Sequence, residues 1–304
     1  MPDQERVLNK RLSKEHHGYL FALAAAASFG LMSFFAHQNP YQYPGEQLVF
    51  FRGLSGTILL LPLVWKKIYL FFRRDGKLLW LRSFAGAVSI LCFFYTLQNT
   101  SPANANLLAS STPIFVGIFS WIFFSEKLNS REMIGILLVL LGDVLLHIPS
   151  QSSIPFTVGA IGLFGALTTS IAFMSLRQVA QKYSASLIVF GFSLISLLIS
   201  YFWHGSHIWI MPRSNHIIFL LAVAFLGLFS QILTTLAFTY VRGSVAAAIG
   251  RSVIIWSGIF DFFWGSFKPS NIELISYTAV LLGVFLVQNR SAKNNAAQVN
   301  KKNN

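Results

Sequence analysis

Long apolar runs separated by short polar stretches dominate the chain. Ten such runs, of about 20 residues each, follow one another from residue 18 to residue 289. An α-helix rises ~1.5 Å per residue, so about 20 residues cross a hydrocarbon core of ~30 Å. The pattern therefore predicts an all-α integral membrane protein with ten transmembrane helices, at residues 18–36, 45–65, 78–98, 103–125, 132–148, 156–176, 185–203, 216–240, 244–266 and 272–289.

The two halves of the chain match when one is shifted by about 141 residues. Gly117-Ile118-Phe119 falls on Gly258-Ile259-Phe260, and Leu140-Leu141-Gly142 falls on Leu281-Leu282-Gly283. Each half has five predicted spans, an odd number, so the second half should enter the membrane from the opposite side. This is the inverted-topology repeat of alternating-access carriers. We expect a cytoplasmic N-terminal segment (1–17), a first repeat with helices 1–5 (18–149), a second repeat with helices 6–10 (154–289) and a disordered cytoplasmic tail (290–304).

Composition and charge support a membrane protein. Hydrophobic residues make up 54% of the chain and charged residues 11%, against about 25% charged in soluble domains. The net charge of +13 does not indicate nucleic acid, because the basic residues are sorted by membrane side. With a cytoplasmic N-terminus, 19 of the 23 Lys and Arg, including Arg82, fall inside, whereas only Arg213 and Lys268 fall outside. The positive-inside rule thus predicts both termini in the cytoplasm, and we expect a bacterial inner membrane protein.

Four charged residues lie within predicted spans: Arg52, Asp143, Arg251 and Asp261. Each costs about 2.5 to 3.5 kcal/mol at the membrane centre on insertion scales, so each invites a functional interpretation. Arg52 and Asp143 are both expected in the outer half, where they could form a structural ion pair or take part in function. Asp261 is also expected there, and the two aspartates are the candidates for carrying a proton. Arg251 is expected nearer the cytoplasm, where it either binds an anionic substrate group or snorkels to the surface.

A stripe of small and polar residues runs along helix 4 and another along helix 9. Such stripes usually pack helices closely. Pro113 changes the interpretation for helix 4, because a proline frees the carbonyl four residues earlier, here that of Ala109. We therefore expect a binding wall at mid-membrane. Its candidates are the hydrogen-bonding side chains Asn106, Ser110 and Thr112 beside Pro113, and the rings Phe93, Phe94, Tyr95 and Trp256.

Motifs of enzymes and pumps are not found in the sequence. It has no G-x-x-x-x-G-K-[ST], no H-E-x-x-H and no G-x-S-x-G. Cys92 is the single cysteine, and the histidines His204, His207 and His216 have no neighbouring carboxylate or thiol to complete a metal site. We expect no enzyme activity, no cofactor, no metal and no nucleic acid. The expected partners are a small-molecule substrate and the lipid bilayer, and the sequence leaves a homodimer open.

One run of residues resembles a known family. Thr112-Pro113-Ile114-Phe115, followed by Trp121, Phe124, Glu126-Lys127-Leu128, Gly135 and Gly142, is similar to the signature of the EamA family in the drug/metabolite transporter superfamily. The resemblance implies a basket-like bundle whose central cavity is lined by helices 1, 3, 4, 6, 8 and 9, with helices 5 and 10 at the periphery. It places Arg251 and helix 4 at the cavity and makes Asp143 structural. Ile254 and Phe267 depart from the family's usual Pro and Glu in the second repeat.

The family also bears on the substrate. Arg52 together with Arg251 resembles the pattern of EamA carriers of S-adenosylmethionine. Helix 1 lacks the membrane-embedded glutamate with which four-helix multidrug relatives exchange protons. The sequence therefore predicts a secondary transporter of a small organic metabolite with a carboxylate, such as an amino acid or S-adenosylmethionine. Export of hydrophobic amino acids or drugs is the alternative within transport, and a membrane scaffold or lipid-modifying protein is the alternative outside it.

Overall fold

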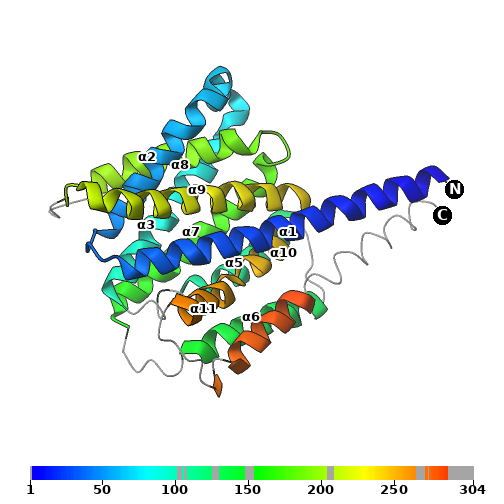
Figure 1. Cartoon of the computed structure of the whole chain (residues 1–304). Helices are drawn as coiled ribbons and strands as arrows, with labels where there is room; N and C mark the ends of the chain where they lie inside the picture. Colours follow the sequence, from blue (N-terminus) through cyan, green and yellow to red (C-terminus); the bar gives the residue numbers. More distant parts are fainter. Residues whose placement is uncertain are drawn as a thin grey trace.

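The computed structural model describes residues 2–100, 105, 108–124, 130–147, 154–203, 209–264, 271–272 and 274–286. All regular elements in these ranges are helices, gathered into one bundle from which the start of α1 extends (Figure 1), and the predicted all-α class is confirmed. The α-helices are α1 (Pro2–Gln38), α2 (Gly45–Val64), α3 (Lys77–Asn99), α5 (Thr112–Phe124), α6 (Ser130–His147), α7 (Phe156–Val179), α8 (Ala185–Trp203), α9 (Ile217–Tyr240), α10 (Gly243–Gly250) and α11 (Val253–Trp264). Short 3-10 helices are η1 (Trp65–Phe72), η2 (Arg74–Gly76) and η3 (Ser214–His216), and a last helix covers Leu274–Leu286.

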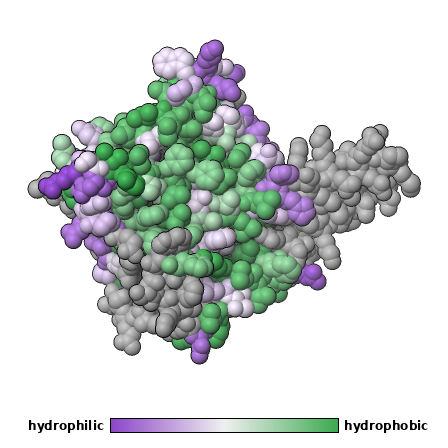
Figure 2. All heavy atoms as spheres, in the orientation of Figure 1, coloured by the Kyte–Doolittle hydropathy of each residue, from purple (hydrophilic) through white to green (hydrophobic). Residues whose placement is uncertain are grey.

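The outer surface of the bundle is suited to lipid. Large apolar side chains point outward, among them Phe156 with 90% of its surface exposed and Ile218 with 80%. Figure 2 shows one face as mainly hydrophobic, with hydrophilic residues toward its edges. Such a surface would be unfavourable in water by about 25 cal/mol per Å² of apolar area. The protein is therefore an integral membrane protein, as predicted. Within the described residues, six helical stretches are long and apolar enough to cross a bilayer: Glu15–Ala36, Gly45–Phe72, Lys77–Asn99, Phe156–Val179, Ala185–Trp203 and Ser214–Tyr240.

The contacts between helices come in equivalent pairs. Each contact recurs when both helices are replaced by their counterparts in the other half of the chain. The helix α1 packs along α9, and α7 packs along α3. In the same way α1 contacts α11, and α7 contacts α5. The helix α2 packs against α8, which occupies the corresponding place in the second half. Every one of these contacts thus has a counterpart about 141 residues along the chain.

Two glycines in equivalent positions of the two halves make equivalent contacts at atomic detail. A Cβ placed on Gly142 of α6 would lie 2.7 Å from the carbonyl oxygen of Ser276 and 2.7 Å from Val280 Cγ2. A Cβ placed on Gly283 would lie 2.5 Å from the carbonyl oxygen of Gly135 and 2.8 Å from Val139 Cγ2. Because these distances are too short for any side chain, only glycine allows α6 and the helix Leu274–Leu286 to approach so closely.

Helix 9 is broken, which corrects the single span predicted at 244–266. The helix α10 ends at Gly250 and α11 begins at Val253, with a turn at Arg251 and Ser252 between them. In this turn Ser252 N donates to the carbonyl oxygen of Ile249 at 2.9 Å, an i to i−3 bond. No proline accounts for this break, because residue 254 is isoleucine. Gly250 is a poor helix former at the same point and favours the end of α10.

Helix 4 is interrupted at the corresponding place. A turn at Ser110 and Ser111 precedes α5, and Ser111 N donates to the carbonyl oxygen of Leu108 at 3.2 Å. Pro113 has no N–H to continue a regular helix here, as the sequence indicated. Residues 110–111 and 251–252 are 141 positions apart, so both halves carry a break at the same point.

Candidate functional site

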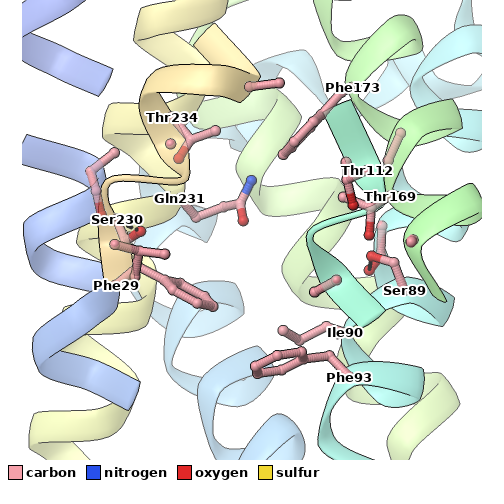
Figure 3. Close-up of a pocket in the computed structure, with 18 of the residues that line it drawn as sticks. Phe29, Ser89, Ile90, Phe93, Thr112, Thr169, Phe173, Ser230, Gln231 and Thr234 are labelled. Atoms are coloured by element: carbon pink, nitrogen blue, oxygen red, sulfur yellow. Dashed lines mark hydrogen bonds between the residues drawn. The ribbon is translucent and has the colours of Figure 1, made fainter. Parts of the chain in front are cut away.

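A cavity of about 220 Å³ lies at the centre of the bundle, between α1 and α9 on one side and α3, α5 and α7 on the other (Figure 3). These helices, together with α10, are the ones that the family resemblance placed around a cavity. The labelled side chains that face it are Phe29, Ser89, Ile90, Phe93, Thr112, Thr169, Phe173, Ser230, Gln231 and Thr234 (Figure 3).

The hydroxyl groups of the wall are mostly committed to nearby carbonyl oxygens. Ser89 Oγ donates to the carbonyl of Gly86 at 2.8 Å, Thr169 Oγ1 to that of Gly165 at 2.7 Å and Ser230 Oγ to that of Ala25 at 3.0 Å. Since each hydroxyl has one hydrogen, these groups can only accept hydrogen bonds from a ligand. Strong donors to a ligand must therefore come from amide or cationic side chains of the wall.

Arg52 of α2 is one of these cationic side chains. Its side chain is 6% exposed and lines the cavity. Its Nη2 donates to the carbonyl oxygen of Gly227 at 3.2 Å and to Gln231 Oε1 at 3.4 Å, while its Nη1 has no hydrogen-bond partner among the described residues. The predicted pair with Asp143 is not tested, because the carboxylate of Asp143 lies outside the described side chains. Only glycine at position 227 leaves room for the Arg52 side chain, since a Cβ there would lie 2.7 Å from Arg52 Nε.

Arg82 of α3 is a candidate site residue that its sequence context did not indicate, because it follows a basic stretch expected in the cytoplasm. It lines the cavity and is 2% exposed, and its Nε has no hydrogen-bond partner among the described residues. Gly86, one helical turn further along α3, leaves the room that the Arg82 guanidinium occupies. The signal in the sequence is therefore a glycine four residues after an arginine near the start of a span, and this pattern is weak.

Arg251 lies at the break of helix 9 and lines the cavity. Its Nη2 donates to Ser110 Oγ. Ser110 is the residue that corresponds to Arg251 in the first half, so the two broken helices meet at equivalent positions. Thr112 and Pro113, also predicted for the site, line the cavity beside this contact.

Other candidates from the sequence lie elsewhere or are not described. Phe94 is buried in a core cluster with Tyr43 and Leu91, and its neighbour Phe93 lines the cavity instead. Trp256 packs with Ala26, Val253 and Ile254. Tyr95 is half-buried, and its carbonyl accepts a hydrogen bond from Asn99. Neither Tyr95 nor Trp256 is among the described residues that line the cavity. The whole of Asn106 and the side chain of Asp261 lie outside the described part.

His216 belongs to a separate cluster, formed by the segments before α2 and before α9. The Tyr43 hydroxyl and His216 Nδ1 share a hydrogen bond of 2.7 Å, and the ring of Tyr41 stacks on His216 with centroids 3.7 Å apart. Burial, and to a smaller extent Tyr41, raises the pKa of the Tyr43 hydroxyl above 10.0. The Gln47 side chain makes two hydrogen bonds with the backbone of Ile210, donating from Nε2 to its carbonyl oxygen and accepting from its N–H at Oε1. These contacts join the α1–α2 loop region to the segment before α9.

Comparisons with known proteins agree on the kind of protein. Residues 16–148 match the EamA-like transporter family. The pseudopaline exporter CntI of Pseudomonas aeruginosa (strain UCBPP-PA14) is 27% identical over 257 residues, which cover 84% of this chain and 90% of the exporter. Solute carrier family 35 member G1 of Mus musculus is 26% identical over 264 residues, which cover 80% of this chain and 70% of that protein.

A solved crystal structure supports the fold. It superposes with a TM-score of 0.72 at 16% sequence identity, and the match covers 92% of this chain and 98% of that chain. At this identity the likeness concerns the fold alone. The part of the chain at residues 16–148 is thus similar to the EamA-like transporter family, and most of the chain is similar to transporters.

Proposed function

We propose that the chain is an alternating-access secondary transporter built of two inverted five-helix repeats, residues 18–149 and 154–289. The helix contacts support this. Each contact between a helix of the first half and a helix of the second half recurs between their counterparts in the other half, and such reciprocal contacts are the signature of a two-fold axis. The family match over 16–148 supports the extent of the first repeat.

The proposed ten spans consist of the six long helical stretches and four further spans. Helix 4 contains α5 and the described residues just before it, helices 5 and 10 are α6 and Leu274–Leu286, and helix 9 is α10 followed by α11. Both termini then lie on the cytoplasmic side of a bacterial inner membrane, as the distribution of basic residues predicts. The predicted tail, 290–304, lies outside the described residues.

The central cavity carries the proposal. It is enclosed by helices of both repeats, and the broken helices 4 and 9 meet at its wall. Irregular backbone is tolerated at membrane depth where it lines a cavity, and in transporters it commonly marks the substrate site. Rocking one repeat against the other about the two-fold axis would open this cavity to one side of the membrane and then to the other.

The proposed substrate is a small organic metabolite with a carboxylate, such as an amino acid or a derivative like S-adenosylmethionine. Arg251 would hold the carboxylate, and Ser110, Thr112 and Asn106 would add hydrogen bonds. The rings Phe29, Phe93 and Phe173, which line the cavity, suit an apolar or flat remainder. These rings also favour hydrophobic amino acids or drugs as the second candidate. The similarity to an exporter supports transport out of the cell.

Counterflow in proteoliposomes tests this function. Vesicles are loaded with an unlabelled candidate, and entry of labelled amino acids, S-adenosylmethionine, a sugar and a lipophilic cation is followed. We expect entry of a carboxylate-bearing compound, and loss of that entry in Arg251→Ala while the protein remains folded and inserted. Entry of the cation alone would contradict the carboxylate substrate. Wild-type rates in Arg251→Ala would remove Arg251 from the site.

A further inference from the structure

Two arginines from different helices converge on one end of the central cavity. Arg52 of α2 and Arg82 of α3 both line it, and both lie over the ring of Phe192 of α8. The guanidinium carbon of Arg52 is 5.7 Å from the ring centre, and that of Arg82 is 5.2 Å from it. The two cations can therefore be no further apart than the sum of these distances.

Neither guanidinium is neutralised by a described carboxylate. Arg52 donates to the carbonyl of Gly227 and the amide oxygen of Gln231, both uncharged, and each arginine keeps a buried nitrogen without a partner among the described residues. Buried charges in proteins are normally paired, because leaving one uncompensated is unfavourable. Placing two like charges at one end of a cavity adds mutual repulsion to this cost.

Local packing holds these charges in place. A Cβ on Gly227 would collide with Arg52, and a Cβ on Gly86 would collide with Arg82, so each guanidinium lies directly against a helix backbone. Arg82 begins near the cytoplasmic end of α3, yet it does not extend toward the surface, since only 2% of it is exposed. A basic side chain with only a topological role would be expected to reach the headgroups.

We propose that Arg52 and Arg82 form a two-cation subsite, so that the transported metabolite carries at least two separate anionic groups, most simply two carboxylates. This rests on the proposed transport function and narrows its substrate class. One carboxylate would be bound by Arg52 and Gln231 and the other by Arg82, and both guanidinium groups lie over the ring of Phe192. Guanidinium groups suit this task because their donors match the geometry of carboxylate oxygens.

Matched acid and amide pairs test the subsite. Glutamate and glutamine, aspartate and asparagine, and glutarate and its monoamide differ by one negative charge at nearly constant shape. Thermal unfolding of the purified protein in detergent, at fixed ionic strength, reports binding, because a ligand of the folded state raises the unfolding temperature. For at least one pair we expect the acid to stabilise the wild-type protein more than its amide.

Variants assign the effect to the two arginines. In Arg52→Gln and in Arg82→Gln the stabilising acid should bind at least about tenfold more weakly, and its advantage over the amide should disappear. Arg213→Gln, an exposed arginine outside the cavity, is the control and should keep the advantage. If a glutamine variant does not fold, Gly86→Ala, which keeps both charges but displaces the Arg82 guanidinium, should reduce the preference for the acid, and an unchanged preference would overturn the subsite.

The outcomes separate the subsite from transport. No difference between acid and amide in the wild-type protein, or an unchanged difference in Arg82→Gln, would overturn the two-cation subsite even if counterflow of a monocarboxylate proceeds. Arg82-dependent binding of an acid without counterflow of any compound would contradict the proposed transporter instead.

Discussion

Replacing Gly227 by alanine should disturb the cavity without touching any charged residue. A Cβ at this position would lie 2.7 Å from Arg52 Nε, 2.9 Å from Arg52 Cδ and 3.0 Å from Met32 Sδ. Such distances are too short, so Arg52 must withdraw from the α9 backbone. It then loses the bond from its Nη2 to the carbonyl oxygen of Gly227. The substitution therefore tests whether Arg52 is held in place by α9.

One stabilising and two destabilising terms set the expected change in the free energy of unfolding. Alanine favours a helix over glycine by about 0.5–1 kcal/mol. Overpacking of a buried site costs about 1–3 kcal/mol. Losing a hydrogen bond from a charged donor costs about 1.5–3 kcal/mol. We therefore expect Gly227→Ala to destabilise the protein by about 2–4 kcal/mol and to reduce counterflow strongly, because the displaced guanidinium no longer faces its ligand position.

Thermal unfolding in detergent and counterflow rates give the two readouts. Gly159→Ala in α7 is the matched control, because a Cβ there meets only Ile154 Cγ2, at an ordinary contact distance of 3.7 Å. It should be neutral or slightly stabilising. If Gly227→Ala were as stable as Gly159→Ala and transported at the wild-type rate, the position assigned to Arg52 would be refuted.

Two further predictions concern helix packing and the contact between Tyr43 and His216. Gly142→Ala and Gly283→Ala each bring a Cβ against a backbone carbonyl of the opposite helix, so each should lower the unfolding temperature by a similar amount, corresponding to about 1–3 kcal/mol. One silent and one damaging variant would contradict the two-fold packing of these helices. Tyr43→Phe removes the hydrogen bond to His216 and should cost about 1 kcal/mol. Because burial raises the pKa of Tyr43 above 10.0, its contribution should be complete below pH 10 and decline as the pH rises through the folded value. An unfolding titration from pH 8 to 11 that shows no difference between the two proteins would argue against this contact.

Much of the fold could be predicted because lipid imposes a simple requirement on sequence. Long apolar runs indicated most helices within a few residues, and Pro113 indicated the interruption before α5. The break at Arg251 and Ser252 was missed, since residue 254 is isoleucine and a single glycine inside a long apolar run does not by itself indicate a break. Its position becomes apparent only from the repeat, which places it 141 residues after the break at Ser110 and Ser111.

The site was partly predictable for a similar reason. A charge within an apolar run is visible, so Arg52 and Arg251 were found, and both line the cavity. Arg82 follows a basic stretch near a helix start, where local sequence is typical of a cytoplasmic loop. Its inward direction depends on Gly86 and on Phe192 of another helix, and such a contact has no local signal. The sequence also could not separate the candidates Phe93, which lines the cavity, and Phe94, which is buried in a core cluster, because the direction of neighbouring side chains depends on the rotation of the helix.

Access to the cavity from both sides of the membrane is the most direct test of alternating access. The chain has one cysteine, the half-buried Cys92, so Cys92→Ala provides a background for a single reporter. Thr234→Cys places that reporter in the cavity wall (Figure 3). Right-side-out and inside-out vesicles are treated with a membrane-impermeant maleimide. Alternating access predicts labelling of this one position in both orientations, with substrate changing the two labelling rates. Labelling from one side only, with and without substrate, would contradict it.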